Sequence, residues 1–174
     1  MIKLFKPSKY YNSVFQVNYQ KLFDEGIKVI ACDLDNTLVP HDVDLPDENV
    51  KYLVNKIQSI GLEFIIISNN NKTRVKKFAD PISVDYNYSS KKPLPGVFHK
   101  IAKKYNVANN EIALVGDQIM TDVFGANSTK VVSVLVRPLA KRDIVYTKIN
   151  RFFERIVLKL LAKKKLFKDG EFYE

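Results

Sequence analysis

The chain has 174 residues, of which 46% are hydrophobic, so it is long and apolar enough to bury one substantial core and is not intrinsically disordered. The single cysteine, Cys32, excludes an internal disulfide and a cysteine-rich zinc site, and no apolar run approaches the roughly 18 residues of a transmembrane helix. The net charge is +9, and residues 148–168 hold eight Lys or Arg residues and one acid, which indicates an anionic partner for the C-terminal end.

The first 16 residues are interrupted by lysines and a proline, and they lack the continuous apolar core of a secretory signal. We therefore expect a cytoplasmic protein. Five short apolar runs further along are typical of buried strands. These runs cover residues 27–33, 62–68, 82–87, 111–117 and 131–136. They are continuous and rich in β-branched residues, as in a parallel sheet that is covered on both faces.

Helical patterns separate these runs. Apolar residues recur at helical spacing between Asp47 and Ile60 and again between Pro95 and Tyr105, and proline suits the first position of a helix. Residues 118–128 show a weaker helical pattern. The alternation of strands and helices predicts an α/β fold with a Rossmann-like, doubly wound parallel sheet. The intervals between the strands leave no room for an inserted cap domain.

Polar residues follow the predicted strands at the points where these strands end. In an open parallel sheet, binding sites form outside the carboxyl ends of the strands. We therefore expect these polar residues to converge at one edge of the sheet. They are Asp33, Asp35, Ser68, Asn69, Asp117 and the segment SSKKPLPG at residues 89–96.

The expected group of side chains suits phosphate chemistry. Aspartates are ligands for a hard cation such as Mg²⁺, which usually shares its site with a phosphate. A hydroxyl, backbone N–H groups and a lysine are donors to phosphate oxygens. A carboxylate can attack phosphorus and form an aspartyl-phosphate. The pair Asp33 and Asp35 then supplies one nucleophile and one general acid/base.

Four ordered motifs resemble those of the haloacid dehalogenase superfamily of phosphatases. DLDNT at residues 33–37 resembles the first motif, DxDxT, and Ser68 ends a strand as the second motif requires. Lys92 precedes a proline, as in the third motif, and GDQIMTD at residues 116–122 resembles the acidic fourth motif. The strings DLDNTLVP, SNNN, KKPL and GDQIMTDVFGAN are similar to the YqeG-type subfamily, class IIIA, whose relatives include a mitochondrial phosphatidylglycerophosphatase. His41 departs from this subfamily, in which an aromatic residue is expected.

The resemblance implies a role for each matched residue and Mg²⁺ as the cofactor. Asp33 is the expected nucleophile, and Asp35 is the expected acid that protonates the leaving oxygen and the base that activates water. The implied metal ligands are Asp33, Asp35 through its backbone carbonyl, Asp117 and Asp122. The implied phosphate-binding residues are Asn36, Ser68, Asn69 and Lys92, and Lys92 also counts as catalytic.

Several of these residues have plain structural alternatives. Ser68 could cap the helix that follows it, and Asp122 could be an acid on a helix surface. Lys91 competes with Lys92 for the phosphate, and we favour Lys92 because a proline follows it. Cys32 lacks the arginine six positions later that a cysteine phosphatase needs, so we interpret it as a small buried residue.

After a phosphatase core at residues 1–146, residues 147–174 are predicted to form a basic amphipathic helix and tail. The apolar residues at helical spacing are Ile149, Phe152, Phe153, Ile156, Val157, Leu160 and Leu161. Helices with an apolar stripe among basic residues commonly lie on anionic membranes. The alternative is that the stripe packs on the sheet and the lysines are solvated.

Together these features predict a Mg²⁺-dependent phosphomonoesterase at the inner face of the membrane. The favoured substrate is a lipid headgroup phosphate, phosphatidylglycerophosphate, which would give phosphatidylglycerol. One alternative is a soluble phosphatase for a nucleotide, sugar or protein phosphate. Another is an RNA- or ribosome-binding protein on the same scaffold. The basic segment has few aromatic side chains for base stacking, which argues against nucleic acid without excluding it.

Overall fold

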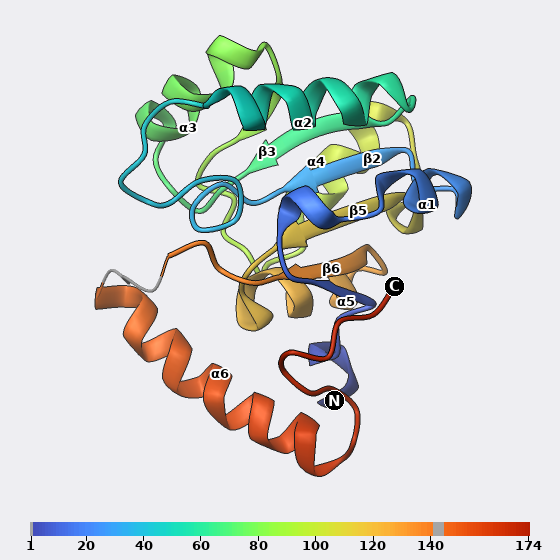
Figure 1. The fold of residues 1–174 in the computed structure, drawn as a ribbon, viewed down its shortest axis with the longest axis vertical. Coiled ribbons are helices and arrows are strands. Elements are labelled where there is room, and N and C mark those ends of the chain that lie inside the picture. Colours follow the sequence, from blue (N-terminus) through green and yellow to red (C-terminus); the bar gives the residue numbers. More distant parts are fainter. Residues whose placement is uncertain (1, 141–144) are drawn as a thin grey trace.

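The computed structural model describes the backbone of residues 2–140 and 145–174, and the side chains of residues 2–140 and 154–174. Within these residues, six parallel strands form one sheet in the order β1-β6-β5-β2-β3-β4 (Figure 1). The strands are β1 Lys9–Tyr11, β2 Val29–Cys32, β3 Glu63–Ile67, β4 Asp85–Asn87, β5 Ile112–Gly116 and β6 Val132–Val136. The chain moves outward in one direction from β2 to β4 and in the other from β5 to β6, so the order reverses between β2 and β5.

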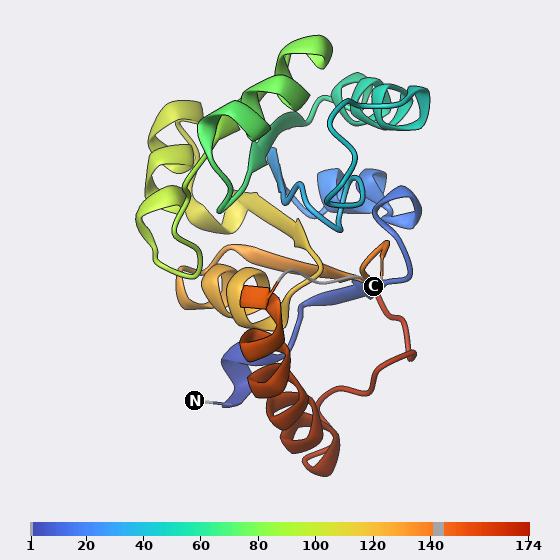
Figure 2. The ribbon, with the colours of Figure 1, turned by 90° about the vertical axis from the view of Figure 1, so that its left-hand side faces the viewer.

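Helices connect the strands and cover both faces of the sheet, as Figures 1 and 2 show. The helices are α1 Tyr19–Asp24, α2 Glu48–Ser59, α3 Lys72–Ala79, α4 Gly96–Tyr105, α5 Phe124–Ser128 and α6 Val145–Lys163. A π-helical turn, η5 Ile119–Val123, leads directly into α5. The predicted α/β fold with a doubly wound parallel sheet is therefore confirmed.

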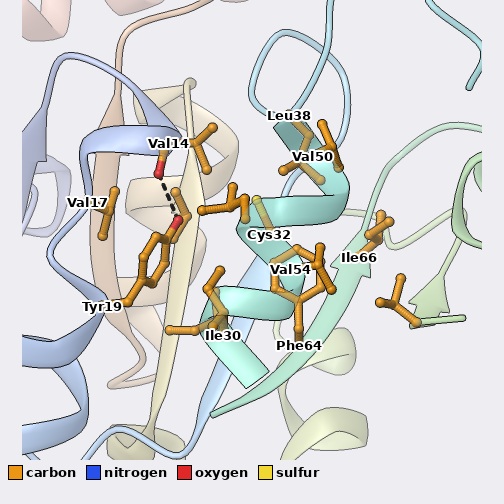
Figure 3. Packing of buried hydrophobic residues seen from close by; sticks show 14 of the residues in the cluster. Val14, Val17, Tyr19, Ile30, Cys32, Leu38, Val50, Val54, Phe64 and Ile66 are labelled. Carbon is orange, nitrogen blue, oxygen red and sulfur yellow. Dashed lines mark hydrogen bonds between the residues drawn. The ribbon is translucent and has the colours of Figure 1, made fainter. Parts of the chain in front are cut away.

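Neighbouring residues of β2 face opposite layers, because side chains alternate along a strand. Ile30 and Cys32 pack in the layer that contains α1, α2 and α3, whereas Val29 and Ala31 pack against α4 and α5. Figure 3 shows the first of these layers, in which Cys32 is enclosed by apolar side chains. Burial raises the pKa of the Cys32 thiol well above its ordinary value, which suits a packing role and not a nucleophile.

Helix α2 illustrates how the sequence sets these elements. Asp47 is its N-cap and accepts a hydrogen bond from the Val50 N–H at 2.9 Å, which satisfies one free donor of the first turn. The apolar positions that predicted the helix are the buried ones. They are Val50, Leu53, Val54 and Ile57. Figure 3 shows Val50 and Val54 among the buried apolar side chains of this layer.

The structure refines the sequence prediction at several elements. Of the strand predicted at residues 82–87, the part Asp85–Asn87 forms β4, and Ile82 ends a 3-10 turn. Strand β1 was not predicted, because a run of three residues carries too little periodicity to be recognised. Residues 118–128, predicted as one weak helix, form the π-helical turn η5 followed by α5. In the described part of the chain, α2 is the one α-helix between β2 and β3, and α3 is the one between β3 and β4, so no cap domain is inserted there.

Helix α6 and the tail after it pack beside the β1–β6 end of the sheet (Figures 1 and 2). Leu161 and Phe167 are buried and share a cluster with Tyr10 and Leu135. The tail returns to the sheet, where the backbones of Tyr10 and Tyr173 exchange hydrogen bonds of 2.7 and 2.9 Å. The end of α6 and the tail therefore pack against β1 and β6 and form part of the hydrophobic core.

Part of the predicted apolar stripe and the predicted domain boundary remain untested by the structure. The side chains of Ile149, Phe152 and Phe153 and the boundary between residues 146 and 147 lie outside the described side chains. In the described ranges, no helix combines the length and the hydrophobicity that crossing a bilayer requires.

Candidate active site

The candidate site lies where the strand order reverses. Asp33 directly follows β2, and Asp117 directly follows β5, the neighbouring strand on the other side of the reversal. The N–H of Asp33 still donates to the Val115 carbonyl at 2.9 Å, so the strand pairing holds the backbone at this position. The carboxyl ends of two central strands therefore deliver two aspartates to the crevice in which open parallel sheets bind ligands.

Three buried carboxylates form a cluster in this crevice. Asp33, Asp117 and Asp122 each offer an oxygen atom, and these atoms lie within 4.8 Å of one another. Asp122 comes from η5, and its Oδ2 accepts the Gln118 N–H at 3.1 Å. We call these three residues the acid cluster.

Gly116 allows Asp122 to approach β5 this closely. A Cβ at residue 116 would lie 2.4 Å from Cγ of Asp122, far inside van der Waals contact. The glycine at the end of β5 is therefore part of the construction of the acid cluster. Its place directly before Asp117 is the sequence signal for this role.

Lys92 contributes a positive charge to the acid cluster. Its Nζ lies 2.6 Å from Oδ1 of Asp33 and 2.7 Å from Oδ1 of Asp122, and the side chain is buried. Asn69 holds the backbone of this residue, because its amide accepts the Lys92 N–H at 2.8 Å and donates to the Lys92 carbonyl at 3.1 Å. Lys91 is exposed, so the geometry favours Lys92 as the phosphate ligand.

Burial and mutual repulsion shift the ionisation of the acid cluster. Burial raises the pKa of Asp33 to about 7, although Lys92 opposes the shift. Burial, with Asp33 and Asp122 nearby, also raises the pKa of Asp117 well above its ordinary value. Burial alone would lower the pKa of Lys92, but Asp122 and Asp33 outweigh this effect and raise it, so the lysine stays charged.

The acid cluster fits a divalent cation. When its three carboxylates are ionised, the ammonium of Lys92 offsets one of three negative charges, and the raised carboxyl pKa values show that the remainder is costly. Three oxygen donors within 4.8 Å are also the ligand type that Mg²⁺ prefers. The residues present therefore suit the expected cofactor in both charge and chemistry.

The carboxylate of Asp35 lies beside the acid cluster and has different partners. Its Oδ1 accepts hydrogen bonds from Nε and Nη2 of Arg74 at 3.3 and 3.0 Å, and it lies 3.3 Å from Nδ1 of His41. Its Oδ2 accepts from the Asn70 amide at 3.3 Å. Ser68 Oγ is 3.5 Å from the same oxygen, at the limit of a hydrogen bond. These contacts hold the side chain of Asp35 apart from the three carboxylates.

The remaining predicted phosphate ligands also lie at this edge. Ser68 is buried at the end of β3, and its Oγ accepts the Asn70 N–H at 3.0 Å. Asn36 is buried with φ at +65°, a conformation that asparagine tolerates, and its Oδ1 has no hydrogen-bond partner among the described atoms. The structure thus brings every predicted site residue to the carboxyl edge of the sheet.

Further neighbours of the site, in addition to Gly116 and His41, were not predicted from the sequence. Thr37 donates from Oγ1 to Oδ1 of Asp117 at 3.2 Å, and its position in DLDNT was the available signal. Arg74 and Asn70 contact Asp35, and both follow the strand end that carries Ser68. The sequence locates them near the start of α3, but the direction of a long arginine side chain depends on tertiary packing.

Comparisons with known proteins agree with this geometry. The family model for haloacid dehalogenase-like hydrolases matches residues 9–128. The chain is 32% identical over 162 residues to the protein named "Probable phosphatase YqeG" of Bacillus subtilis. That match covers 93% of this chain and 94% of the Bacillus protein.

Solved structures support the fold. A deoxy-D-mannose-octulosonate 8-phosphate phosphatase from Haemophilus influenzae, in a cobalt-bound form, superimposes with a TM-score of 0.53 at 12% identity, over 86% of this chain and 96% of that one. A D,D-heptose 1,7-bisphosphate phosphatase from B. bronchiseptica, complexed with magnesium and phosphate, superimposes with a TM-score of 0.52 at 15% identity. The match covers 75% of this chain and 99% of that one. At these identities the likeness concerns the fold.

Proposed function

The chain belongs to the haloacid dehalogenase-like hydrolase family, and on that premise we propose that it is a Mg²⁺-dependent phosphomonoesterase that acts through an aspartyl-phosphate. The observation that carries the proposal is the contact of Asp33 with Lys92 inside the acid cluster. This arrangement combines a carboxylate nucleophile, a fixed ammonium for phosphoryl oxygens and ligands for a divalent cation.

The proposed reaction has two steps. A carboxylate oxygen of Asp33 bonds to phosphorus while the ester P–O bond breaks, and the departing alcohol takes a proton from Asp35. Water then attacks the phosphorus of the aspartyl-phosphate and gives a proton to Asp35. The bond between phosphorus and the Asp33 oxygen breaks, so inorganic phosphate leaves and the Asp33 carboxylate is restored. Lys92 presents positive charge to the phosphoryl oxygens in both steps.

The surroundings of Asp35 suit its proposed role. Arg74 and Asn70 fix the carboxylate outside the acid cluster, so it is not consumed as a side-chain metal ligand. A residue that shuttles a proton must be held in a fixed position within reach of the leaving oxygen, and the contacts of Asp35 with Arg74 and Asn70 fix that position.

The remaining site residues supply binding. Mg²⁺ would be held by Asp33, Asp117 and Asp122, with the backbone carbonyl of Asp35. When bound, it supplies positive charge that reduces the repulsion between the attacking carboxylate and the phosphoryl oxygens. We assign phosphate binding to Ser68 and Asn36, and we assign to Asn69 the positioning of Lys92.

We also propose that the phosphate is carried by a lipid headgroup, with phosphatidylglycerophosphate as the substrate. In the described residues between β2 and β4, α2 and α3 are the α-helices that connect the strands, so no inserted domain there restricts a bulky substrate. An open site of this kind suits a phosphate that stands on a large carrier.

The outer face of α6 supports a membrane partner. Ile156 and Leu160 are 42% and 44% exposed and lie one turn apart. Arg155, Lys159 and Lys163 are exposed around them. Exposed apolar residues ringed by basic ones suit the surface of an anionic membrane, to which each basic residue adds about 1 kcal/mol of attraction.

The experiment compares phosphate release from phosphatidylglycerophosphate in mixed micelles with release from a panel of soluble phosphate esters, using the purified full-length chain and Mg²⁺. We expect the lipid phosphate to be preferred, and we expect chelation of the metal or the Asp33→Asn substitution to abolish release. A preference for a nucleotide, sugar or protein phosphate would replace the lipid substrate with a soluble one. Unchanged turnover in Asp33→Asn would refute the nucleophile.

A further inference from the structure

A cavity of about 370 Å³ adjoins the acid cluster, between the carboxyl end of β6 and helix α6. We call it the β6–α6 groove. Among its lining residues are Asp117, Ile119, Leu135, Arg137, Leu158 and Phe167. Asp117 therefore belongs to both the acid cluster and the wall of the groove, so the part of a long substrate that lies beyond the phosphate ester can reach this cavity past Asp117.

One wall of the groove is apolar and firmly packed. Ile119, Leu135 and Phe167 are buried members of one hydrophobic cluster, and Leu158 of α6 packs against them. The ring of Phe167 lies 5.1 Å from the ring of Tyr10, measured between centroids, which ties the tail to β1. The wall is thus formed by η5 and β6 together with α6 and the tail, and it offers apolar contact to a ligand.

The groove also holds an arginine that is only partly engaged. Arg137 is 45% exposed at its side chain, and its Nη2 lies 3.6 Å from Asp169, which is long for a hydrogen bond. Its Nε donates weakly to the Tyr10 hydroxyl at 3.4 Å, and the guanidinium lies 5.3 Å from the centre of the Phe172 ring. These contacts orient the guanidinium and leave donors for an anion.

The acidic residues of the groove other than Asp117 have partners within the chain. Glu154 accepts a hydrogen bond from the Ile119 N–H at 2.8 Å, and Asp169 accepts a hydrogen bond from the Tyr10 hydroxyl. Arg137 is therefore the groove residue best suited to attract an anionic group, and it follows β6 at the same carboxyl edge as Asp117.

We propose that the β6–α6 groove binds the alcohol part of the substrate, and that this alcohol carries apolar surface together with a second anionic group. A phosphorylated amphiphile with an internal phosphodiester has this chemistry: the monoester lies at the acid cluster, the diester pairs with Arg137, and the apolar part contacts Leu158 and Phe167. The proposal rests on the proposed phosphatase function. A volume of about 370 Å³ is within the range of small-ligand sites.

The proposal gives α6 a role that is separate from membrane contact. Leu158 faces the groove, whereas Ile156 and Leu160 lie on the exposed face of the same helix. Substrate selection should therefore persist with a dispersed substrate, in the absence of any membrane or micelle.

The test uses two soluble probes: glycerol 3-phosphate and dihexanoyl phosphatidylglycerophosphate below its critical micelle concentration. The measured quantity is the ratio of kcat/KM for the amphiphile to kcat/KM for glycerol 3-phosphate. We expect Leu158→Gln and Arg137→Gln each to lower this ratio about tenfold, because each removes a contact that only the amphiphile makes. Arg137→Lys keeps the charge and loses the guanidinium fork. Its ratio should therefore lie between those of the wild type and Arg137→Gln.

The matched control is Leu45→Gln, at an exposed leucine that does not line the groove. This control should leave the ratio unchanged, and hydrolysis of glycerol 3-phosphate by each variant reports that the variant is folded. An unchanged ratio in both groove variants, with wild-type turnover intact, would refute the groove and leave the phosphatase function standing. If the wild type releases no phosphate from either probe, the phosphatase function fails and the groove proposal fails with it.

Discussion

Asp33 and Asp35 stand one residue apart in the sequence and occupy different electrostatic surroundings. Asp33 is buried against Lys92 and two further carboxylates, and burial raises its pKa to about 7. Asp35 is more exposed and has Arg74 as its closest cation. Two carboxyl groups held in contrasting environments are suited to two different roles, one as nucleophile and one as proton carrier.

Lys92 provides a direct test of this arrangement. Lys92→Met keeps the unbranched side chain and removes the ammonium that contacts Asp33 and Asp122. We expect kcat/KM for glycerol 3-phosphate to fall by about 10³, equivalent to about 4 kcal/mol of transition-state stabilisation. The matched control is Lys91→Met at the exposed neighbouring lysine, which should retain most activity. Equal losses in the two variants would show that Lys92 has no special position.

Gly116 tests the construction of the acid cluster. In Gly116→Ala the new methyl group would overlap Asp122, so we expect a weaker response to Mg²⁺ and a loss of about 1–3 kcal/mol in the free energy of unfolding. Gly96→Ala is the control, because a Cβ there meets nothing within 4 Å and alanine favours a helix. Urea unfolding and Mg²⁺ titration measure both effects. If Gly116→Ala matches Gly96→Ala in both stability and Mg²⁺ response, the close approach of Asp122 to residue 116 is contradicted.

At the scale of elements, each of the five apolar runs contains a strand, although in the run at residues 82–87 the strand is confined to Asp85–Asn87. Each run is continuous and β-branched, so local pattern and global fold agree. Strand β1 was missed because its three residues are held by pairing with β6 and with Tyr173 of the tail. Such partners are distant in sequence and leave no local pattern.

The C-terminal helix shows how one periodic pattern can serve two surfaces. The spacing of its apolar residues predicted an amphipathic helix, but spacing cannot distinguish a face that packs on protein from one that meets a membrane. The structure separates them: Leu161 is fully buried, whereas Ile156 is 42% exposed.

This difference in burial predicts that alanine substitutions at the two positions lower the free energy of unfolding by different amounts. Leu161→Ala should lower the free energy of unfolding by about 2–5 kcal/mol, because it opens a cavity in the cluster with Phe167 and Tyr10. Ile156→Ala should change it by about 0.5 kcal/mol or less, since the side chain is largely exposed. Urea unfolding followed by circular dichroism measures both. A cost for Leu161→Ala no larger than that for Ile156→Ala would mean that α6 does not pack as described.

At the scale of the whole molecule, the acid cluster couples stability to pH and metal. The pKa of Asp33 is raised from an ordinary 3.8 to about 7, so between these values the folded chain holds a proton that the unfolded chain has released. Stability from this source therefore falls as pH rises through about 4 to 7. The raised pKa of Asp117 adds in the same direction.

We accordingly expect Mg²⁺ to raise the Tm more at about pH 8 than at about pH 5, because the cation competes with protons for the same oxygens. Thermal unfolding with and without Mg²⁺ at both pH values measures the effect. Asp117→Asn should remove most of the Mg²⁺ response, and Asp80→Asn, at an exposed acid, should retain it. A larger Mg²⁺ effect at the lower pH would contradict the coupling.

The candidate site was largely predictable because its residues sit at strand ends, and the fold alone brings strand ends together. Asp33, Ser68 and Asp117 needed only a parallel sheet to converge. Arg74 and the β6–α6 groove were not predictable, because both depend on how side chains and a distant helix pack. The separation of Asp35 from the acid cluster likewise depends on side-chain packing, because its contacts with Arg74 and Asn70 hold it there.

The central claim is that Asp33 carries the phosphoryl group during turnover. Its most direct test is to quench the full-length chain during hydrolysis with Mg²⁺, reduce any acyl phosphate with borohydride, and map the product by peptide mass spectrometry. We predict homoserine at position 33 in the presence of substrate and unmodified aspartate in its absence, with no homoserine at position 35. Continued turnover with no modification at position 33, or with modification at another carboxylate, would contradict the account.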